Sequence, residues 1–158
     1  MSVQLSDELV SLLHDRETIK LLATTDESGT PHVVAKDSIH IAEDGTIHYL
    51  EHLESSRTNH NLVRAIWFDR RVSIVIIGTH QSFQIKGRPL EVHITGPLFQ
   101  KHYAEVRHRL GDVDLSGVWV IEPLEVINEN PEIRRQEEEK RRPFFRHLDR
   151  LAKPLKGI

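Results

Sequence analysis

Short apolar runs separated by turn-forming residues are the feature that most restricts how this chain can fold. Most of them alternate apolar and polar side chains, which is typical of strands with one buried face. Helices are few, and there is no repeated strand–helix–strand rhythm, which argues against a doubly wound parallel sheet. The sequence therefore predicts a mainly β fold with peripheral helices, an antiparallel barrel of six strands that removes exposed strand edges. The runs are 19–25, 31–42, 46–51, 72–77, 82–95 and 118–127.

Three helices are expected around this barrel. The first follows Ser6, a residue type that caps helix N-termini, and ends before Thr18. The second covers residues 56–66. The third opens at Gly96-Pro97 and stops at Gly111, since proline suits the first helical position and glycine the helix end. Its apolar side chains recur at helical spacing and are expected to face the core: Phe99, Tyr103, Val106 and Leu110.

The last fifth of the chain differs in composition from the rest. Residues 128–158 contain nine Lys/Arg and six Asp/Glu, a net charge of +3, so the remainder carries −6 to give the total of −3. A chain of 158 residues is long enough for one domain with its own core. We expect a barrel domain at 1–127 and a charged, helical C-terminal extension at 128–158.

Composition also disfavours several classes of function. Without cysteine there is no disulfide framework, thiol nucleophile or thiolate metal site. The net charge of −3 does not indicate nucleic-acid binding, which usually requires a basic surface. No apolar run approaches the roughly 20 residues of a membrane helix. We therefore expect a cytoplasmic protein that contacts neither nucleic acid nor membrane.

A phosphate-binding sequence lies where the second helix begins. Ser55, Ser56, Arg57 and Thr58 place hydroxyls and a guanidinium beside the unpaired N–H groups and partial positive charge of a helix start. Such an arrangement suits a phosphate dianion. The alternative is an ordinary capped surface helix with an exposed arginine.

The order of the elements and these residues resemble the FMN-binding split-barrel family. That family includes pyridoxamine 5'-phosphate oxidase and small bacterial FMN-binding proteins, and the resemblance covers roughly residues 8–127. In the small FMN-binding branch a basic residue and a threonine are followed by asparagine three residues later, as in Arg57, Thr58 and Asn61. The oxidase branch has Ser-Arg-Lys, so Ser56 and Arg57 match it and Thr58 does not. The resemblance implies a split barrel that holds FMN at the interface of a homodimer.

The resemblance implies further cofactor contacts on two strands. Val34, Lys36, Asp37 and Ser38 would lie along the flavin, although Lys36 and Asp37 could equally be solvent-facing strand residues. On a later strand the polar positions are Ser82 and Gln84, where Ser82 replaces the glutamine of the oxidases. Trp119 could border the flavin or belong to the core.

Eleven histidines raise the possibility of a metal site, which we do not expect from the sequence. His48 and His52 flank Glu51 in a predicted strand, and His102 and His108 are six residues apart on one helix. The i, i+4 spacing of His48 and His52 would support metal binding on a helix with a third ligand, but His48 lies in a predicted strand. His102 and His108 face different directions on their helix. The sequence also lacks a Gly-x-Ser-x-Gly nucleophile motif.

The resemblance favours an FMN-dependent oxidoreductase of an unidentified small molecule, with no catalytic residue assigned. The alternatives are a non-catalytic electron-transfer or flavin-storage protein, or a protein of the same fold that binds haem or F420. The tryptophan-containing substrate segment of the oxidases is missing, so vitamin B6 oxidation is not expected. The C-terminal residues Phe144, Phe145, Leu148 and Leu151 are predicted to form an amphipathic helix that packs on a partner subunit.

Overall fold

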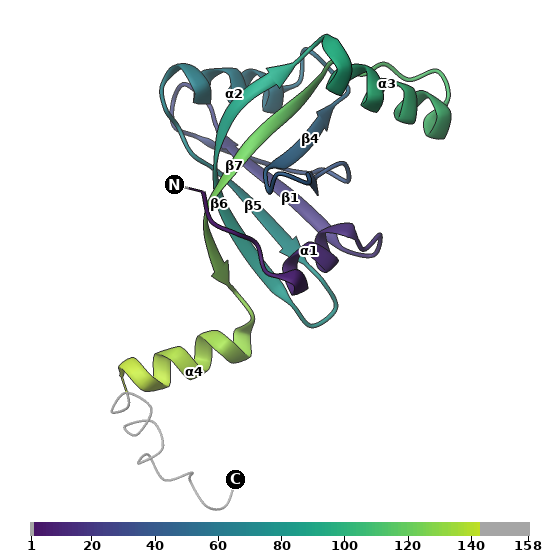
Figure 1. Ribbon diagram of the computed structural model, residues 1–158. Coiled ribbons are helices and arrows are strands. Elements are labelled where there is room, and N and C mark those ends of the chain that lie inside the picture. Colours follow the sequence, from purple (N-terminus) through teal and green to yellow (C-terminus); the bar gives the residue numbers. More distant parts are fainter. Residues whose placement is uncertain (1, 143–158) are drawn as a thin grey trace, which may run out of the picture.

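A single antiparallel sheet, curled into a half-barrel, forms the body of the protein (Figure 1). The computed structural model describes residues 2–142. The seven strands follow the spatial order β2-β1-β5-β6-β7-β4-β3. They are β1 (Ile19–Thr25), β2 (Pro31–Ala35), β3 (His40–Ile41), β4 (Ile47–Glu51), β5 (Val72–Ile77), β6 (Ser82–His93) and β7 (Gly117–Asn128). The helices are α1 (Asp7–His14), α2 (Arg57–Trp67), α3 (Gly96–Leu110) and α4 (Pro131–Arg141).

The predicted mainly β fold is confirmed, with seven strands instead of six. The additional strand arises because the run 31–42 is interrupted by a turn at Asp37 and Ser38, which leaves β2 and the two-residue β3 on either side. The turn takes β3 away from β1, and His40 pairs with His48 of β4. β2 and β3 therefore lie at opposite ends of the strand order.

The ladder between β6 and β7 gives the sheet its curvature. Register shifts occur at Lys86/Gly87 and at Pro89/Glu91, as expected for β-bulges, which bend and twist a strand. Gly87 is required at the first shift, since a Cβ atom there would lie 2.7 Å from Ile121 Cγ2. The bend predicted from the glycine and proline at positions 87 and 89 is confirmed.

The main core lies inside the curled sheet and is covered at its ends by helices. α1 contributes Leu9, Leu12 and Leu13, and α2 contributes Leu62. Both helices begin at a serine whose Oγ accepts a backbone N–H: Ser6 from Leu9 at 3.3 Å and Ser56 from Asn59 at 2.9 Å. These caps confirm the predicted helix starts.

β4 is buried on both faces because α3 covers the outer side of the sheet there. Ile47 and Tyr49 belong to the main core, whereas Leu50 packs in a second cluster with Val106 of α3. The predicted inward face of α3 is partly wrong, since Tyr103 and Leu110 are 37% and 51% exposed. The buried positions of α3 are His102 and Val106.

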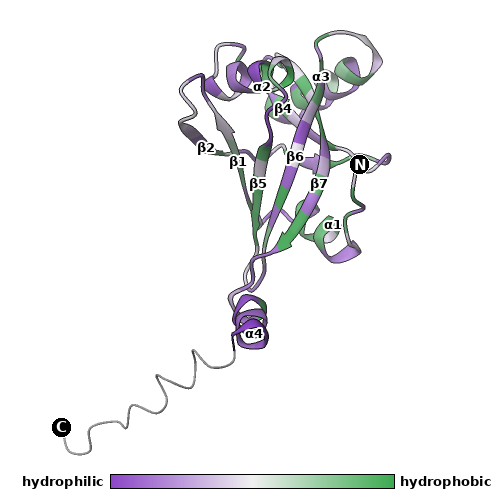
Figure 2. Cartoon of the chain, turned by 90° about the vertical axis from the view of Figure 1, so that its left-hand side faces the viewer, coloured by the Kyte–Doolittle hydropathy of each residue, from purple (hydrophilic) through white to green (hydrophobic). Residues whose placement is uncertain are grey.

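α4 projects away from the sheet and is mostly hydrophilic (Figure 2). It has no buried residue, and its charges pair with one another, as in Arg134 with Glu137 at 2.7 Å. Up to Arg141, this part of the chain is therefore a helix with no buried residue. The predicted helix after Pro143 lies outside the described residues. Within residues 2–142 no helix is long and apolar enough to span a membrane.

Leu62 and Val63 provide a test of how α2 packs. Leu62 is fully buried, and Val63 is 39% exposed. Leu62→Ala is expected to lower the free energy of unfolding by about 2–5 kcal/mol through lost burial and a cavity. Val63→Ala should change it by no more than about 0.5 kcal/mol. Urea denaturation of the two variants measures the difference, and equal losses would contradict the observed orientation of α2.

Candidate functional site

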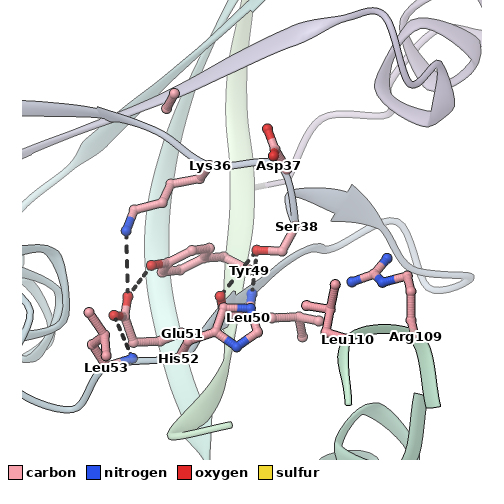
Figure 3. Close-up of a pocket in the computed structure, with 11 residues that line it drawn as sticks. Lys36, Asp37, Ser38, Tyr49, Leu50, Glu51, His52, Leu53, Arg109 and Leu110 are labelled. Atoms are coloured by element: carbon pink, nitrogen blue, oxygen red, sulfur yellow. Dashed lines mark hydrogen bonds and ion pairs between the residues drawn. The ribbon is translucent and has the colours of Figure 1, made fainter. Parts of the chain in front are cut away.

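A polar pocket lies where β4 ends, and we call it the strand pocket (Figure 3). Its volume is about 460 Å³. One wall is the segment 35–38 that follows β2, and the opposite wall is the segment 49–53 at the end of β4. Arg109 and Leu110 of α3 complete the lining. The pocket therefore combines three of the predicted contact residues, Lys36, Asp37 and Ser38, with a strand end that sequence analysis did not single out.

Glu51 organises the polar side of the strand pocket. Its carboxylate is 2% exposed, accepts hydrogen bonds from the Tyr49 hydroxyl and from Leu53 N at 3.2 Å, and lies 4.0 Å from Lys36 Nζ. Lys36 Nζ also lies 5.3 Å from the centre of the Tyr49 ring. Burial and the Glu51 carboxylate raise the pKa of Tyr49, so its hydroxyl remains a hydrogen-bond donor. The chain thus presents a fixed carboxylate beside an ammonium.

Ser38 is held by the backbone of β4. Its Oγ accepts from Leu50 N and donates to Leu50 O, both at 3.1 Å. This pair of bonds fixes the turn after β2 against β4 and thereby keeps the strand pocket in shape. Val34 pairs with Leu22 within the sheet and does not line the pocket.

The start of α2 lines a second depression of about 550 Å³, the helix groove. Ser55 and Arg57 line it, Arg57 is exposed, and its guanidinium has no hydrogen bond or ion pair within residues 2–142. The backbone N–H groups of Arg57 and Thr58 also have no partner in this part of the chain. Three carboxylates, those of Asp26, Glu27 and Glu54, line the same groove.

Thr58 and Asn61 of α2 are both 1% exposed, and Asn61 forms a hydrogen bond to the barrel. Asn61 Nδ2 donates to Thr24 Oγ1 of β1 at 3.0 Å. Asn61 Oδ1 is buried without a partner among the described residues, and the residue lines the helix groove. The structure therefore brings Ser55, Arg57 and Asn61 together at the groove, while the cap Ser56 and the buried Thr58 support the helix start.

A third depression, of about 840 Å³, connects the first two around the loop between β4 and α2. It shares His52 and Leu53 with the strand pocket and Glu54, Ser55 and Asn59 with the helix groove. Trp119 is fully buried at its base, and its Nε1 donates to Asn59 Oδ1 at 2.9 Å. Within one chain Trp119 is a core residue that positions Asn59.

Ser82 and Gln84 are not brought to this site by a single chain. Ser82 O accepts from Glu129 N just before α4, whereas α2 lies near the far end of β6, where Val92 pairs with Trp119. Ten residues of strand separate Ser82 from Val92, a span of roughly 30 Å.

Sequence analysis missed a cluster of three histidines beneath α3. Donor atoms of His40, His48 and His102 lie within 4.8 Å of one another. Burial lowers the pKa of all three rings, that of His48 to about 4. The alternation of β4 could have revealed part of the cluster, since His48 and Leu50 share the face opposite to Ile47 and Tyr49.

No protein-family model and no curated protein matches the sequence. Solved structures match the fold over most of the chain. HupZ from Group A Streptococcus has a TM-score of 0.66 and 18% sequence identity, covering 80% of this chain and 95% of that chain. An FMN-binding protein from Syntrophomonas wolfei subsp. wolfei has a TM-score of 0.61 and 13% identity, with 78% and 88% covered.

Two further structures of this fold have other ligands in their names. HutZ, the heme storage protein from Vibrio cholerae, has a TM-score of 0.56 and 18% identity, with 80% of this chain and 95% of that chain covered. An F420 reductase has a TM-score of 0.55 and 17% identity, with 74% and 94% covered. The chain thus has the split-barrel fold of pyridoxamine-phosphate-oxidase-like FMN-binding proteins, a fold that is also found with haem and F420.

The low pKa of His48 predicts a loss of stability in acid. Between its ordinary value of 6.5 and the folded value of about 4, the unfolded chain takes up a proton that the folded chain does not. The free energy of unfolding therefore falls as the pH is lowered, by about 2 kcal/mol between pH 7.5 and pH 5 for this ring. Urea denaturation with a chelator present measures it.

His48→Gln should lose this part of the pH dependence, and His108→Gln, on an exposed position of α3, should retain it. An unchanged pH dependence in His48→Gln would contradict the assignment.

Proposed function

We propose that this split-barrel protein binds FMN, with the phosphate at the helix groove and the ring system along the strand pocket. The observation that carries the proposal is the Arg57 guanidinium beside two N–H groups at a helix start, all of them unpaired within residues 2–142. Such groups together favour a doubly charged phosphate. The presence of an FMN-binding protein among the structures of this fold supports the same ligand.

Three carboxylates line the helix groove and would repel an anion, but two of them already have partners and the third is exposed to solvent. Asp26 Oδ1 accepts from Ser28 N and Thr30 N, both at 2.9 Å, and so is engaged in its own turn. Glu27 lies 3.8 Å from His60 and 3.9 Å from Arg64. Glu54 is exposed to solvent, where its charge is screened. Arg57 therefore remains available for the phosphate.

FMN would supply redox chemistry through its ring system, while the chain binds and orients it. In the strand pocket, Lys36 offers a cation. Ala35 ends β2, which lies at one end of the strand order, and the outer backbone groups of such a strand would pair with a ring edge. We infer an FMN-dependent oxidoreductase that acts on a small molecule, or an electron-transfer or flavin-storage protein that lacks its own substrate. Turnover of a reduced nicotinamide with electron acceptors separates the two.

Haem is the second candidate ligand, and one residue favours it. His52 Nδ1 lies 3.1 Å from Asp114 O, which leaves Nε2 as a possible axial ligand. The residue lines the depression of about 840 Å³ together with apolar side chains that suit a flat, apolar macrocycle. These side chains are Leu53, Val63, Val92, Ile94, Phe99 and Leu115. A Soret band in the absorption spectrum would identify haem, and two bands in the near-ultraviolet and blue would identify flavin.

In our proposal, a second copy of the chain completes the cofactor site. Strand register places Ile19, Val33 and Ile77 on the outer face of the sheet, where they are 53%, 56% and 37% exposed. Ser82 pairs with Ile77 and Gln84 with Val75, so both polar residues lie on this apolar face. The exposed Ala35 borders the strand pocket on the same face. A symmetric dimer through this face would bring Ser82 and Gln84 to a partner's pocket.

Removing the Arg57 guanidinium tests the phosphate site. A charge-assisted hydrogen bond contributes about 1.5–3 kcal/mol, so Arg57→Ala should weaken FMN binding roughly ten- to a hundredfold. Riboflavin, which lacks the phosphate, should bind the wild type and the variant equally. Titration of both ligands into apo-protein measures this, and Arg70→Ala, an exposed arginine just beyond α2, is the matched control. Parallel losses for FMN and riboflavin would show that Arg57 does not bind the phosphate.

A charge placed on the outer face tests the dimer. Val33→Glu should yield a monomer by light scattering at micromolar concentration and should weaken FMN binding, because a buried, unpaired carboxylate is costly. Ile66→Glu, at a 40% exposed position on α2, adds the same charge away from the face and should leave the dimer intact. A monomeric wild type that still binds FMN would exclude an interface site.

A further inference from the structure

Three histidines from three different elements meet on the outer side of the barrel, beneath α3. His40 of β3 and His48 of β4 are direct cross-strand partners, and His102 of α3 lies over them. The His102 ring centroid is 5.2 Å from that of His40 and 6.2 Å from that of His48. We propose that these three side chains form a binding site for a divalent transition metal of the Zn²⁺ type.

Each ring already has a hydrogen-bond partner on one nitrogen, which leaves the other nitrogen for a metal. His40 Nδ1 lies 2.7 Å from Ser38 O, and His102 Nδ1 lies 3.3 Å from Glu105 Oε2. His48 Nε2 lies 3.2 Å from Thr46 Oγ1. Carbonyl, carboxylate and hydroxyl groups of this kind orient the histidines of metal sites and fix their tautomers. Among residues 2–142, the ring nitrogens left without a hydrogen bond are Nε2 of His40, Nδ1 of His48 and Nε2 of His102.

The spacing of the donor atoms is close to what a tetrahedral ion needs. Zn–N bonds of about 2.0–2.1 Å place histidine nitrogens about 3.3 Å apart. One donor atom from each of the three rings lies within 4.8 Å of the others, so closure by an ångström or so completes the set. Small shifts of the three side chains on ion binding would supply this closure. Three histidines with a fourth position open are a known donor set for zinc.

His40 and His102 also help to line a cavity of about 790 Å³, which would hold the fourth ligand. The Lys20 ammonium also lines this cavity and would repel a bound cation. Its Nζ, however, already donates to Ile39 O at 2.7 Å and to Leu13 O at 3.2 Å. Arg16, Lys101 and Arg109 also line the cavity, and its two carboxylates are those of Asp37 and Glu105. This basic lining favours water, hydroxide or a small anion as the fourth ligand, because such a ligand offsets the charge of the ion.

Titration of tag-free, full-length protein with Zn²⁺, followed by calorimetry, tests the site directly. We expect one equivalent per chain. Loss of an outer-shell partner alone weakens metal binding about 10- to 100-fold, so His102→Gln should weaken it by about 100-fold or more. His108→Gln is the matched control on the same helix and should bind Zn²⁺ like the wild type. Equal affinity in the wild type and His102→Gln, or no binding by the wild type, would overturn the proposal.

Two further measurements keep the test decisive if His102→Gln does not fold. His40→Gln removes a less buried ligand and should show the same loss of Zn²⁺ affinity. Co²⁺ added to the wild type should give the intense visible bands of a tetrahedral ion, whereas the weak bands of an octahedral ion would count against the site. Arg57→Ala should bind Zn²⁺ normally, so the outcome is independent of FMN binding.

Discussion

The burial of β4 on both faces is the constraint on which the rest of this structure depends. A strand with one solvent-exposed face can alternate apolar and polar residues, but every side chain of β4 is buried. Ile47 and Tyr49 fill the barrel, whereas His48 and Leu50 lie under α3. The polar groups of this strand consequently need partners, because an unpaired buried polar group is costly. Lys36 is the partner of Glu51 in the strand pocket, and Thr46 is the partner of His48 in the histidine cluster.

Local signals made much of the fold predictable. Serine caps at residues 6 and 56 and the bulge at Gly87 depend on neighbouring residues, so the sequence showed them directly. The break between β2 and β3 was not visible, because it depends on where β3 finds a partner. On α3 the apolar spacing indicated Tyr103 and Leu110, whereas the tertiary structure buries His102. The histidine cluster was missed for the same reason, since its members come from residues 40, 48 and 102 and meet only in the folded chain.

One strand serves two sites of different chemistry. Tyr49 and Glu51 point toward the pocket proposed for a flavin ring, and His48 points toward the cluster proposed for a metal. Because adjacent residues of a strand face opposite sides, the side chains of β4 are divided between the two sites. The strand pocket and the cavity beside the histidines still share Asp37, Ser38, Leu50 and Arg109 in their linings. Leu50 supports both arrangements: its backbone holds Ser38, and its side chain packs against Val106 of α3.

The strand order also determines when the protein can complete its structure. Within residues 2–142, β3 and β4 join the remaining strands only through β7. In β7, Ile121 pairs with Ile47, more than seventy positions earlier in the chain. During synthesis, pairing can begin among β1, β2, β5 and β6. β4 can join the sheet only after the segment 117–128 has been made. Such distant pairing slows folding and leaves apolar strands exposed in the meantime. The sheet can therefore reach its full width only after β7 has been synthesised.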